Sequence, residues 1–288
     1  MISSNEIVEL VKNALINAGS TFRDDKKKAY CSFIRKEINK NSKWALETIL
    51  ENAEVAQKNK SPLCDDTGIP HLLFEIGKYV FMSGQMLLDI KEGIKEGLKK
   101  LPGRPMAIVG NDEERISQEK GISPLSEDVQ PAPFLIRYVD ESVLRLHILM
   151  FGGGPAIRAK TYRVFHKHNK EVVLNEIISW AKQSISELGC TPCTLGVGVG
   201  RSHFEATSMM VEALVDGKYD LQNEMESYIT EEVNKANVGP LGLGGNSSVL
   251  ATFIKVGPQR ASGVRIVCLR PCCCFEPRIA TIDLLSNI

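Results

Sequence analysis

Apolar residues recur at helical spacing through most of the first sixty positions. Ser3 and Glu6 have the spacing of a capping box at the start of the first such segment, and Gly19 offers a stop after it. The remaining positions of these segments are polar, as expected for helices that bury one face only. The pattern predicts three helices, over residues 4–18, 29–38 and 44–57.

Beyond residue 60, short apolar runs typical of strands are interleaved with longer helical stretches. The polar, proline-containing stretch 110–133 is expected to be a surface excursion. Pro102 and Gly103 should end the first helix of this part. The predicted helices are 86–101, 171–188 and 203–214, and the predicted strands are 72–76, 134–139, 143–151, 194–199, 249–256, 264–269 and 279–284.

This order of elements favours a mixed α/β fold. We expect one domain over residues 1–288, in which an N-terminal helical portion (1–60) is followed by a mixed sheet with helices (61–288). We expect chemistry to be carried by loops between these elements, because the cysteines and glycine-rich segments fall there.

Composition excludes several classes of function. The chain has 288 residues, 43% of them hydrophobic, and 35 basic residues balance 35 acidic ones. A formal charge of zero gives no overall field for nucleic acid or for an anionic membrane, and no apolar run is long enough to span a bilayer. The first residues lack a basic region followed by an apolar one, so we expect a cytoplasmic protein whose eight cysteines stay reduced.

Three loops rich in glycine or proline carry cysteines, around Cys64, Cys190 and Cys272. Together they suggest one shared iron–sulfur site. A four-iron cluster held by three thiolates leaves one iron open, and an open iron can act as a Lewis acid on a bound oxygen. Because Cys272, Cys273 and Cys274 are adjacent, at most one or two of them can ligate one site.

Each of these motifs also has a simpler interpretation. Asp65 and Asp66 after Cys64 would suit an ordinary turn. Cys190 and Cys193 form a Cys-x-x-Cys pair that a zinc site or a thioredoxin-like redox site could use, although the surrounding sequence fits neither well. The glycines of 196–200 lack the spacing of a dinucleotide loop, and we expect them to let the backbone pass close to a cluster or ligand.

Two further glycine-rich loops, 151–154 and 242–248, offer backbone N–H groups and hydroxyls suited to a carboxylate, although either could be a plain flexible turn. Arg104 could clamp a carboxylate bidentately. His147 lies within a predicted strand and is expected to be a sheet residue rather than a base.

Taken together and in order, several segments resemble one known family, the iron–sulfur hydro-lyases, specifically the alpha subunit of class I fumarate hydratase and L(+)-tartrate dehydratase. The resemblance covers nearly the whole chain from about residue 40. The combination of segments is far more specific than any one of them. These segments are residues 62–68, 190–192 with 196–199, 239–248, and Cys274 with Arg278.

The resemblance implies a [4Fe-4S] cluster bound by Cys64, Cys190 and one cysteine of the last trio. Cys274 is preferred because Arg278 follows it by four residues as in the family pattern, and Cys272 is the alternative. By position, the implied catalytic residues are Asp66 and Thr67, and the implied substrate-binding residues are Arg104, Gly152, Gly153 and Arg278.

The implied reaction is reversible hydration and dehydration of a small dicarboxylate, fumarate/malate or tartrate/oxaloacetate. A base would remove the proton at C3 while the hydroxyl at C2 leaves. The family completes its site with a second domain, so we expect a separate beta subunit and an assembly of alpha–beta pairs, either a heterotetramer or a homodimer of pairs.

The chain departs from the family pattern at a few positions. Asp65 stands where members usually have Gln, Phe151 where they have a basic or small residue, and residues 259–262 lack a usual His. An added acid disfavours an anionic substrate unless it is paired or protonated. A non-enzymatic cluster-binding protein and a zinc-binding structural module are therefore the competing hypotheses.

Overall fold

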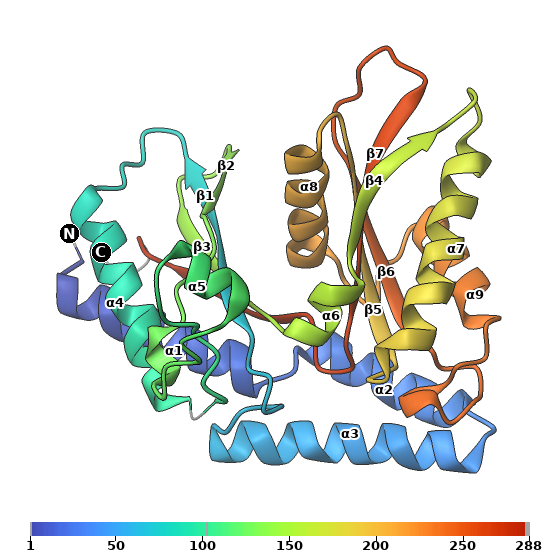
Figure 1. Ribbon diagram of the computed structural model, residues 1–288, viewed down its shortest axis with the longest axis horizontal. Helices are drawn as coiled ribbons and strands as arrows, with labels where there is room; N and C mark the ends of the chain where they lie inside the picture. Colours follow the sequence, from blue (N-terminus) through green and yellow to red (C-terminus); the bar gives the residue numbers. More distant parts are fainter. Residues whose placement is uncertain (1, 102, 286–288) are drawn as a thin grey trace. The chain divides into compact units, whose positions relative to one another are not determined.

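The computed structural model describes residues 2–101 and 103–285 (Figure 1). The chain forms two compact units, each assembled from separate stretches of sequence. The first takes its described residues from Met1–Thr21, Ala53–Gly152 and Arg278–Ile288, and the second is Phe22–Asn52 with Gly153–Pro277. The predicted mixed α/β class is confirmed, since each unit combines helices with a four-stranded mixed sheet.

The first unit is built on a sheet with strand order β2-β1-β3-β8 (Leu135–Val139, Ile69–Gly77, Leu144–Phe151 and Arg278–Asp283). β1 is parallel to β2 and antiparallel to β3, which is antiparallel to β8. α1 (Ser4–Ser20) and α4 (Gly84–Lys100) pack together on one face of this sheet. Their shared core includes Val11, Leu15, Leu72, Phe74, Leu146 and Ile148.

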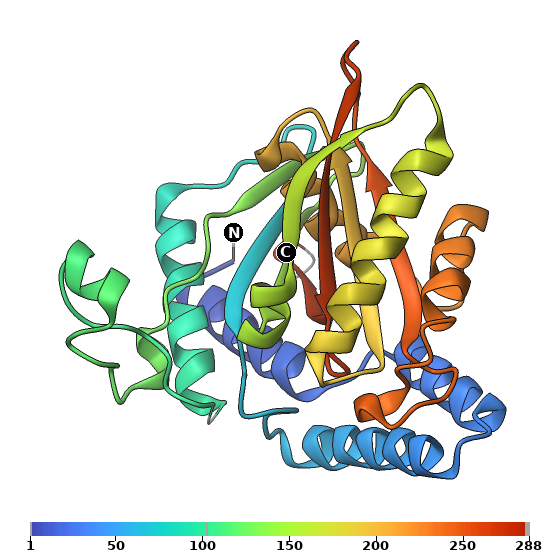
Figure 2. The same cartoon turned by 45° about the vertical axis from the view of Figure 1, so that its right-hand side comes forward.

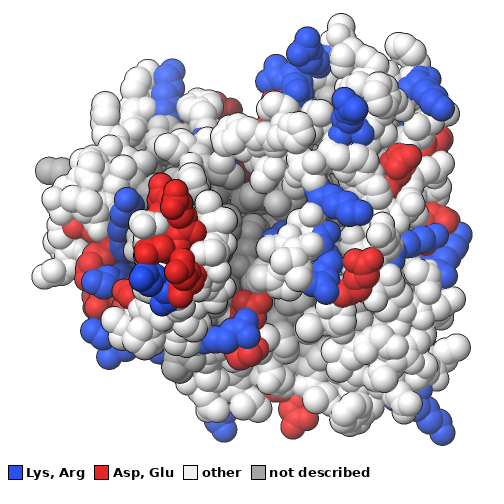
Figure 3. Space-filling model, in the orientation of Figure 1, with Lys and Arg blue, Asp and Glu red and all other residues white. Residues whose placement is uncertain are grey.

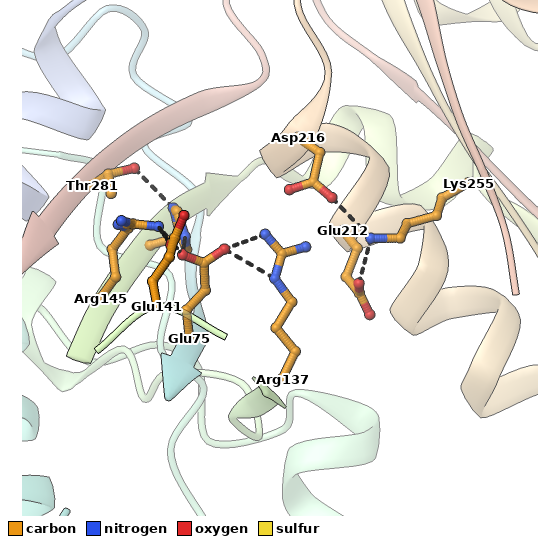
Figure 4. Close-up of polar contacts among 9 residues, drawn as sticks. Glu75, Arg137, Glu141, Arg145, Glu212, Asp216, Lys255 and Thr281 are labelled. Atoms are coloured by element: carbon orange, nitrogen blue, oxygen red, sulfur yellow. Dashed lines mark hydrogen bonds and ion pairs between the residues drawn. The ribbon is translucent and has the colours of Figure 1, made fainter. Parts of the chain in front are cut away.

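The second unit contains the strand order β4-β7-β5-β6 (Lys160–Phe165, Val264–Cys272, Cys193–Gly200 and Val249–Val256). α8 (His203–Asp216) covers one face of the sheet, whereas α7 (Lys170–Leu188) and α9 (Glu224–Asn234) cover the other (Figures 1 and 2). α2 (Asp24–Lys36) also belongs to this unit, and α3 (Lys40–Asn59) contributes to both units. Lys255 of β6 bridges Glu212 and Asp216 of α8 at 2.7 and 2.9 Å (Figure 4).

The alternating glycines of β5 serve helix packing, which corrects the expectation that they make room for a cluster or ligand. A Cβ on Gly198 would lie 2.0 Å from the carbonyl oxygen of Ala206 and 2.3 Å from the backbone nitrogen of Met210. A Cβ on Gly196 would lie 2.9 Å from the side chain of Leu214. The strand is therefore glycine-rich because α8 lies directly against its backbone.

Each predicted helix and strand is present, most of them extended by a few residues. Pro102, expected to help end α4, lies outside the described residues. Four elements were not anticipated, because their apolar residues are few or are separated by charged ones. They are β4, α9, α5 (Asp112–Ser117) and α6 (Gly153–Arg158); the expected excursion 110–133 contains α5 and a short turn of 3-10 helix, η1 (Ser126–Asp128).

The charge distribution agrees with the neutral composition. Basic and acidic side chains are both scattered over the face shown in Figure 3. The first turn of α5 carries three consecutive acidic residues, Asp112, Glu113 and Glu114. No helix among the described residues combines the length and apolarity needed to cross a bilayer.

A buried carboxylate organises the sheet face of the first unit that α1 and α4 leave uncovered. Glu75 of β1 is 4% exposed and binds the guanidinium groups of Arg137 and Arg145 from the two neighbouring strands (Figure 4). His147 lies beside them, with Nδ1 2.8 Å from Thr281 Oγ1 and Nε2 3.5 Å from Glu75 Oε2. His147 is thus a buried sheet residue, as expected, and burial lowers its pKa.

This cluster predicts a specific acid sensitivity. Burial raises the pKa of Glu75, but hydrogen bonds from Arg137 and Arg145 outweigh it and leave the pKa below its ordinary value of 4.5. The ion pairs therefore stabilise the fold fully above pH 4.5, and their contribution is lost as the pH falls through the lowered pKa. Glu75→Gln should cost about 3 kcal/mol at pH 7, because two arginines lose their counter-charge. It should also flatten the pH dependence.

Urea denaturation of wild type and Glu75→Gln from pH 7 to pH 3 tests this. Glu141→Gln is the matched control. Glu141 pairs with the same Arg145 at 3.5 Å but is exposed, so removing its charge should change the stability little. Equal slopes of stability against pH in wild type and Glu75→Gln would contradict the prediction.

Candidate functional site

The first cysteine loop is fixed to the first unit by its backbone. Leu63 is buried and its N–H donates to the carbonyl of Gly19 at 3.0 Å, which holds the start of the loop against the last turn of α1. The half-buried Cys64 follows. Gly68 ends the loop with φ +87°, and a Cβ there would lie 2.6 Å from the backbone of Phe151. Only glycine fits this position, both for its conformation and for its space.

Asp65 is paired within the loop and with Arg104. Its Oδ1 accepts a hydrogen bond from the N–H of Asp66 at 2.9 Å and lies 3.3 Å from the thiol of Cys64. Arg104 Nη1 lies 3.5 Å from Asp65 Oδ2, with both side chains exposed, at 56% and 75%. The Cys64 thiol, the Asp66 N–H and then Arg104 lower the pKa of Asp65, so it is an anion at neutral pH. Arg104 is thus already oriented toward a carboxylate.

Arg278 ties the Asp66 backbone to the end of β3. Its side chain is 2% exposed, its Nη1 donates to the carbonyl of Asp66 at 2.7 Å, and its Nε donates to the carbonyl of Met150 at 3.2 Å. A Cβ on Gly152 would lie 2.8 Å from Asp66 Oδ2 and 3.2 Å from Arg278 Nη2. Because Gly152 has no side chain, both the Asp66 carboxylate and the Arg278 guanidinium can lie close to its backbone.

Thr67 is a buried neighbour of this group. It is 4% exposed, and a Cβ on Gly103 would lie 2.4 Å from its hydroxyl oxygen. Thr67 therefore packs against the backbone that leads to Arg104. The glycine-rich segment 151–154 is shared by the two units: Gly152 belongs to the first unit, and Gly153 begins α6 in the second.

The other two cysteine loops meet in the second unit. The N–H of Cys274 donates to the carbonyl of Cys190 at 2.8 Å, and Cys190 is exposed whereas Cys274 is buried. A hydrogen bond with Cys273, burial, and the negative charges of Cys273 and Cys190 together raise the pKa of the Cys274 thiol. Cys272, by contrast, is the last residue of β7 and pairs with Thr194 inside the sheet.

Helix α2 supplies side chains that hold the last cysteine loop, and sequence patterns missed them. Tyr30 is buried and its hydroxyl donates to the carbonyl of Cys274 at 2.8 Å. Lys26 is buried as well, and its Nζ donates to the carbonyl of Glu276 at 2.7 Å. Lys26 stands in a run of charged residues that is typical of a solvated surface, so nothing local distinguishes it.

The glycine-rich loop 239–248 does bind a carboxylate, but the carboxylate is the chain's own. Glu37, which follows α2, is buried and accepts hydrogen bonds from Ser247 Oγ at 2.6 Å and from the N–H of Asn246 at 3.2 Å. The same loop holds the Cys190 segment, because Thr191 Oγ1 donates to the carbonyl of Gly239 at 2.6 Å. The loop is thus a structural support rather than an open anion site.

The predicted site residues therefore form two groups. The second unit contributes Gly153, Cys190 and Cys274, and the rest belong to the first unit. In the described part of the chain, no set of three or more His, Cys, Asp or Glu side chains is arranged to hold a single metal ion. The residues of the first group are Cys64, Asp66, Thr67, Arg104, Gly152 and Arg278.

The second unit brings together two of the predicted ligands, Cys190 and Cys274, which an iron–sulfur cluster would use. The nearby Cys273 and Cys190 both contribute to the raised pKa of the Cys274 thiol, so the three cysteines are neighbours. A neighbourhood that gathers thiols and penalises free thiolates favours a polycationic metal centre, which neutralises them on binding. The buried Lys26 lies against the same cysteine loop, with its Nζ 2.7 Å from the carbonyl of Glu276.

Comparison with known proteins identifies the family of the chain. The family model for fumarate hydratase (fumerase) matches residues 8–283. A Methanocaldococcus jannaschii protein named "Putative L(+)-tartrate dehydratase subunit alpha" is 27% identical over 96% of this chain and 95% of its own length. L(+)-tartrate dehydratase subunit alpha of Escherichia coli K12 is 23% identical over 93% of this chain and 88% of its own. The chain belongs to the fumarate hydratase family of hydro-lyases.

Proposed function

We propose that the chain is the alpha subunit of a [4Fe-4S]-dependent hydro-lyase that reversibly hydrates or dehydrates a small dicarboxylate, fumarate/malate or tartrate/oxaloacetate. The observation that carries the proposal is the gathering of Cys190 and Cys274 in one unit, in a chain whose family model spans nearly all of it. Cys64 supplies the third thiolate. Such a cluster calls for a reducing compartment such as the cytoplasm, where thiols stay free.

The residues expected to bind substrate or to shape its site have distinct roles in this proposal. Arg104 binds one substrate carboxylate as a charge-assisted partner, and the N–H groups of Gly152 and Gly153 bind carboxylate oxygens. Arg278 holds the Asp66 loop against β3, and its Nη2 lies close to Gly152. Thr67 packs behind the loop and fixes its conformation.

Asp66 is proposed to handle the proton of the departing hydroxyl. When bound, the cluster supplies Lewis-acid activation of the oxygen at C2. The half-buried Asp66 carboxylate lies beside Gly152, so a proton can be held or passed at this point while the C2–O bond breaks. The C3–H bond breaks as a base takes its proton, and the electron pair left behind forms the carbon–carbon double bond.

The base at C3 is proposed to come from a beta subunit. The relatives named above are called alpha subunits, which implies such a partner for them. We propose that this chain likewise works in alpha–beta pairs, assembled as a heterotetramer or as a homodimer of pairs.

Activity of the reconstituted pair tests the proposal. The chain should be coexpressed with the beta subunit, reconstituted anaerobically, and assayed for fumarate hydration, malate dehydration and conversion of L(+)-tartrate to oxaloacetate. Turnover of at least one substrate together with four irons per chain is expected. A full cluster without turnover of any hydroxy-diacid would instead identify a non-enzymatic cluster protein, and stoichiometric zinc without iron would identify a structural zinc module.

Asp65 should weaken substrate binding, because it occupies Arg104 in the absence of substrate. Asp65→Asn removes this competing charge while the backbone of the loop is kept. We expect KM for dicarboxylates to fall about two- to fivefold with kcat nearly unchanged, in line with an exposed ion pair worth up to about 1 kcal/mol. Steady-state kinetics at low and high salt measure this. A rise in KM would show that Asp65 helps substrate binding.

A further inference from the structure

Lys26 is a buried cation without a carboxylate partner. Its side chain is 1% exposed, and its Nζ has the Glu276 carbonyl at 2.7 Å and the ring of Phe22 at 4.4 Å from the centroid. No carboxylate of the described residues lies within ion-pair distance of it. The nearby side chain of Glu276 is already bound at both oxygens by Arg270, at 3.0 to 3.2 Å.

The buried ammonium group of Lys26 is energetically costly unless other groups compensate its charge. Moving an ammonium out of water is costly, and one carbonyl and one aromatic face replace only part of its hydration. Burial accordingly lowers the pKa of Lys26 to about 8, although Cys273, Cys274, Cys272 and Glu276 oppose this shift. When these cysteines are ionised, as a bound metal centre would keep them, their sulfurs are the main groups that favour the charged form of Lys26.

Lys26 is attached to that loop through Glu276, and its helix is attached through a second contact. The Tyr30 hydroxyl, one turn further along α2, donates to the carbonyl of Cys274 at 2.8 Å. Tyr30 offers the loop a neutral hydrogen bond, whereas Lys26 offers it a charge. The two side chains can therefore be used to separate positioning from electrostatics.

We propose that Lys26 is the built-in counter-ion of the iron–sulfur cluster, so that its ammonium offsets the negative charge of the cluster and its thiolates. The inference rests on the proposed function and adds to it a residue outside the ligand set. Thiolates bound to a metal centre stay ionised, so a fixed cation beside them stabilises the loaded state. It also makes addition of an electron to the cluster easier.

The test compares substitutions of Lys26 that remove its charge with control substitutions elsewhere on α2. Lys26→Met removes the charge at similar volume, and Lys26→Gln removes it while keeping an amide donor for the Glu276 carbonyl. Lys28→Met is the matched control, because Lys28 is an exposed lysine of the same helix. Tyr30→Phe removes a hydrogen bond to the same loop without changing its charge.

Each reconstituted protein is measured for the rate of cluster loss to a chelator under anaerobic conditions and for cluster midpoint potential by titration followed with electron paramagnetic resonance. Thermal melts of the cluster-free proteins report the effect on folding. We expect both Lys26 variants to lose the cluster at least tenfold faster and to shift the potential to lower values. Lys28→Met and Tyr30→Phe should leave the potential unchanged.

A potential equal to that of the wild type in the Lys26 variants would overturn the inference, even if their clusters were lost faster. Faster loss with an unchanged potential, as Tyr30→Phe should show, is the result of a purely structural role. If Lys26→Met does not fold, Lys26→Gln carries the test. Failure of the wild type itself to take up a cluster is a different result, which would overturn the proposed function and this inference with it.

Discussion

Replacing Cys274 by alanine is expected to abolish cluster binding and turnover, whereas Cys272→Ala should preserve both. Cys274 lies beyond the end of β7, and its N–H bonds to the carbonyl of Cys190. Cys272 lies within the strand, fully buried, and pairs with Thr194. A ligand must reach a shared site with its sulfur, which favours the loop residue over the strand residue.

The measurement is iron and sulfide content after anaerobic reconstitution, with electron paramagnetic resonance to identify the cluster. Cys274→Ala should fall below about one iron per chain, because a four-iron cluster does not persist on two thiolates. Cys272→Ala removes one buried sulfur, so it should keep the cluster and lose at most about 1–2 kcal/mol of folding stability. The reverse pattern, with the cluster lost only in Cys272→Ala, would assign the third ligand to Cys272.

Asp66→Asn should lower kcat by about 10²- to 10⁴-fold while the cluster and the fold are kept, as expected for loss of a general acid–base group. The substitution keeps the size of the side chain. It also leaves the Asp66 carbonyl available to Arg278, whose hydrogen bond there is made to the backbone. The loss should therefore fall on proton transfer rather than on the shape of the loop.

Steady-state kinetics across pH, with iron content measured on the same samples, test this second prediction. Asp65→Asn is the matched control, because it removes the adjacent carboxylate and should leave kcat nearly unchanged. A large fall in kcat in both variants would indicate a general effect of charge in the loop. Full activity of Asp66→Asn would remove Asp66 from the proton-transfer step.

The secondary structure was largely accessible from local patterns. The first helix and the strand 249–256 were predicted close to their observed bounds, because the periodicity of apolar residues directly reflects which face is buried. β4 and α9 were missed because charged residues interrupt their apolar pattern. Packing on neighbouring elements, rather than a local signal, defines these two.

Tertiary structure decided what the glycine-rich segments do. Residues 196–200 suggested a close approach to a ligand, yet the close neighbour is α8. Residues 242–248 suggested a carboxylate site, and the carboxylate proved to be that of Glu37. Sequence shows that a backbone is accessible, but it does not show which distant group approaches it.

The fold class, the family and the residue types available for chemistry could all be inferred without a structure, because motif order and short-range periodicity are properties of the chain alone. Only the tertiary structure showed that Cys274 rather than Cys272 adjoins Cys190, that Arg278 holds the Asp66 loop, and that Lys26 is buried. These facts depend on contacts between residues more than eighty positions apart in the chain. Burial and charge compensation arise from such contacts, so no local pattern encodes them.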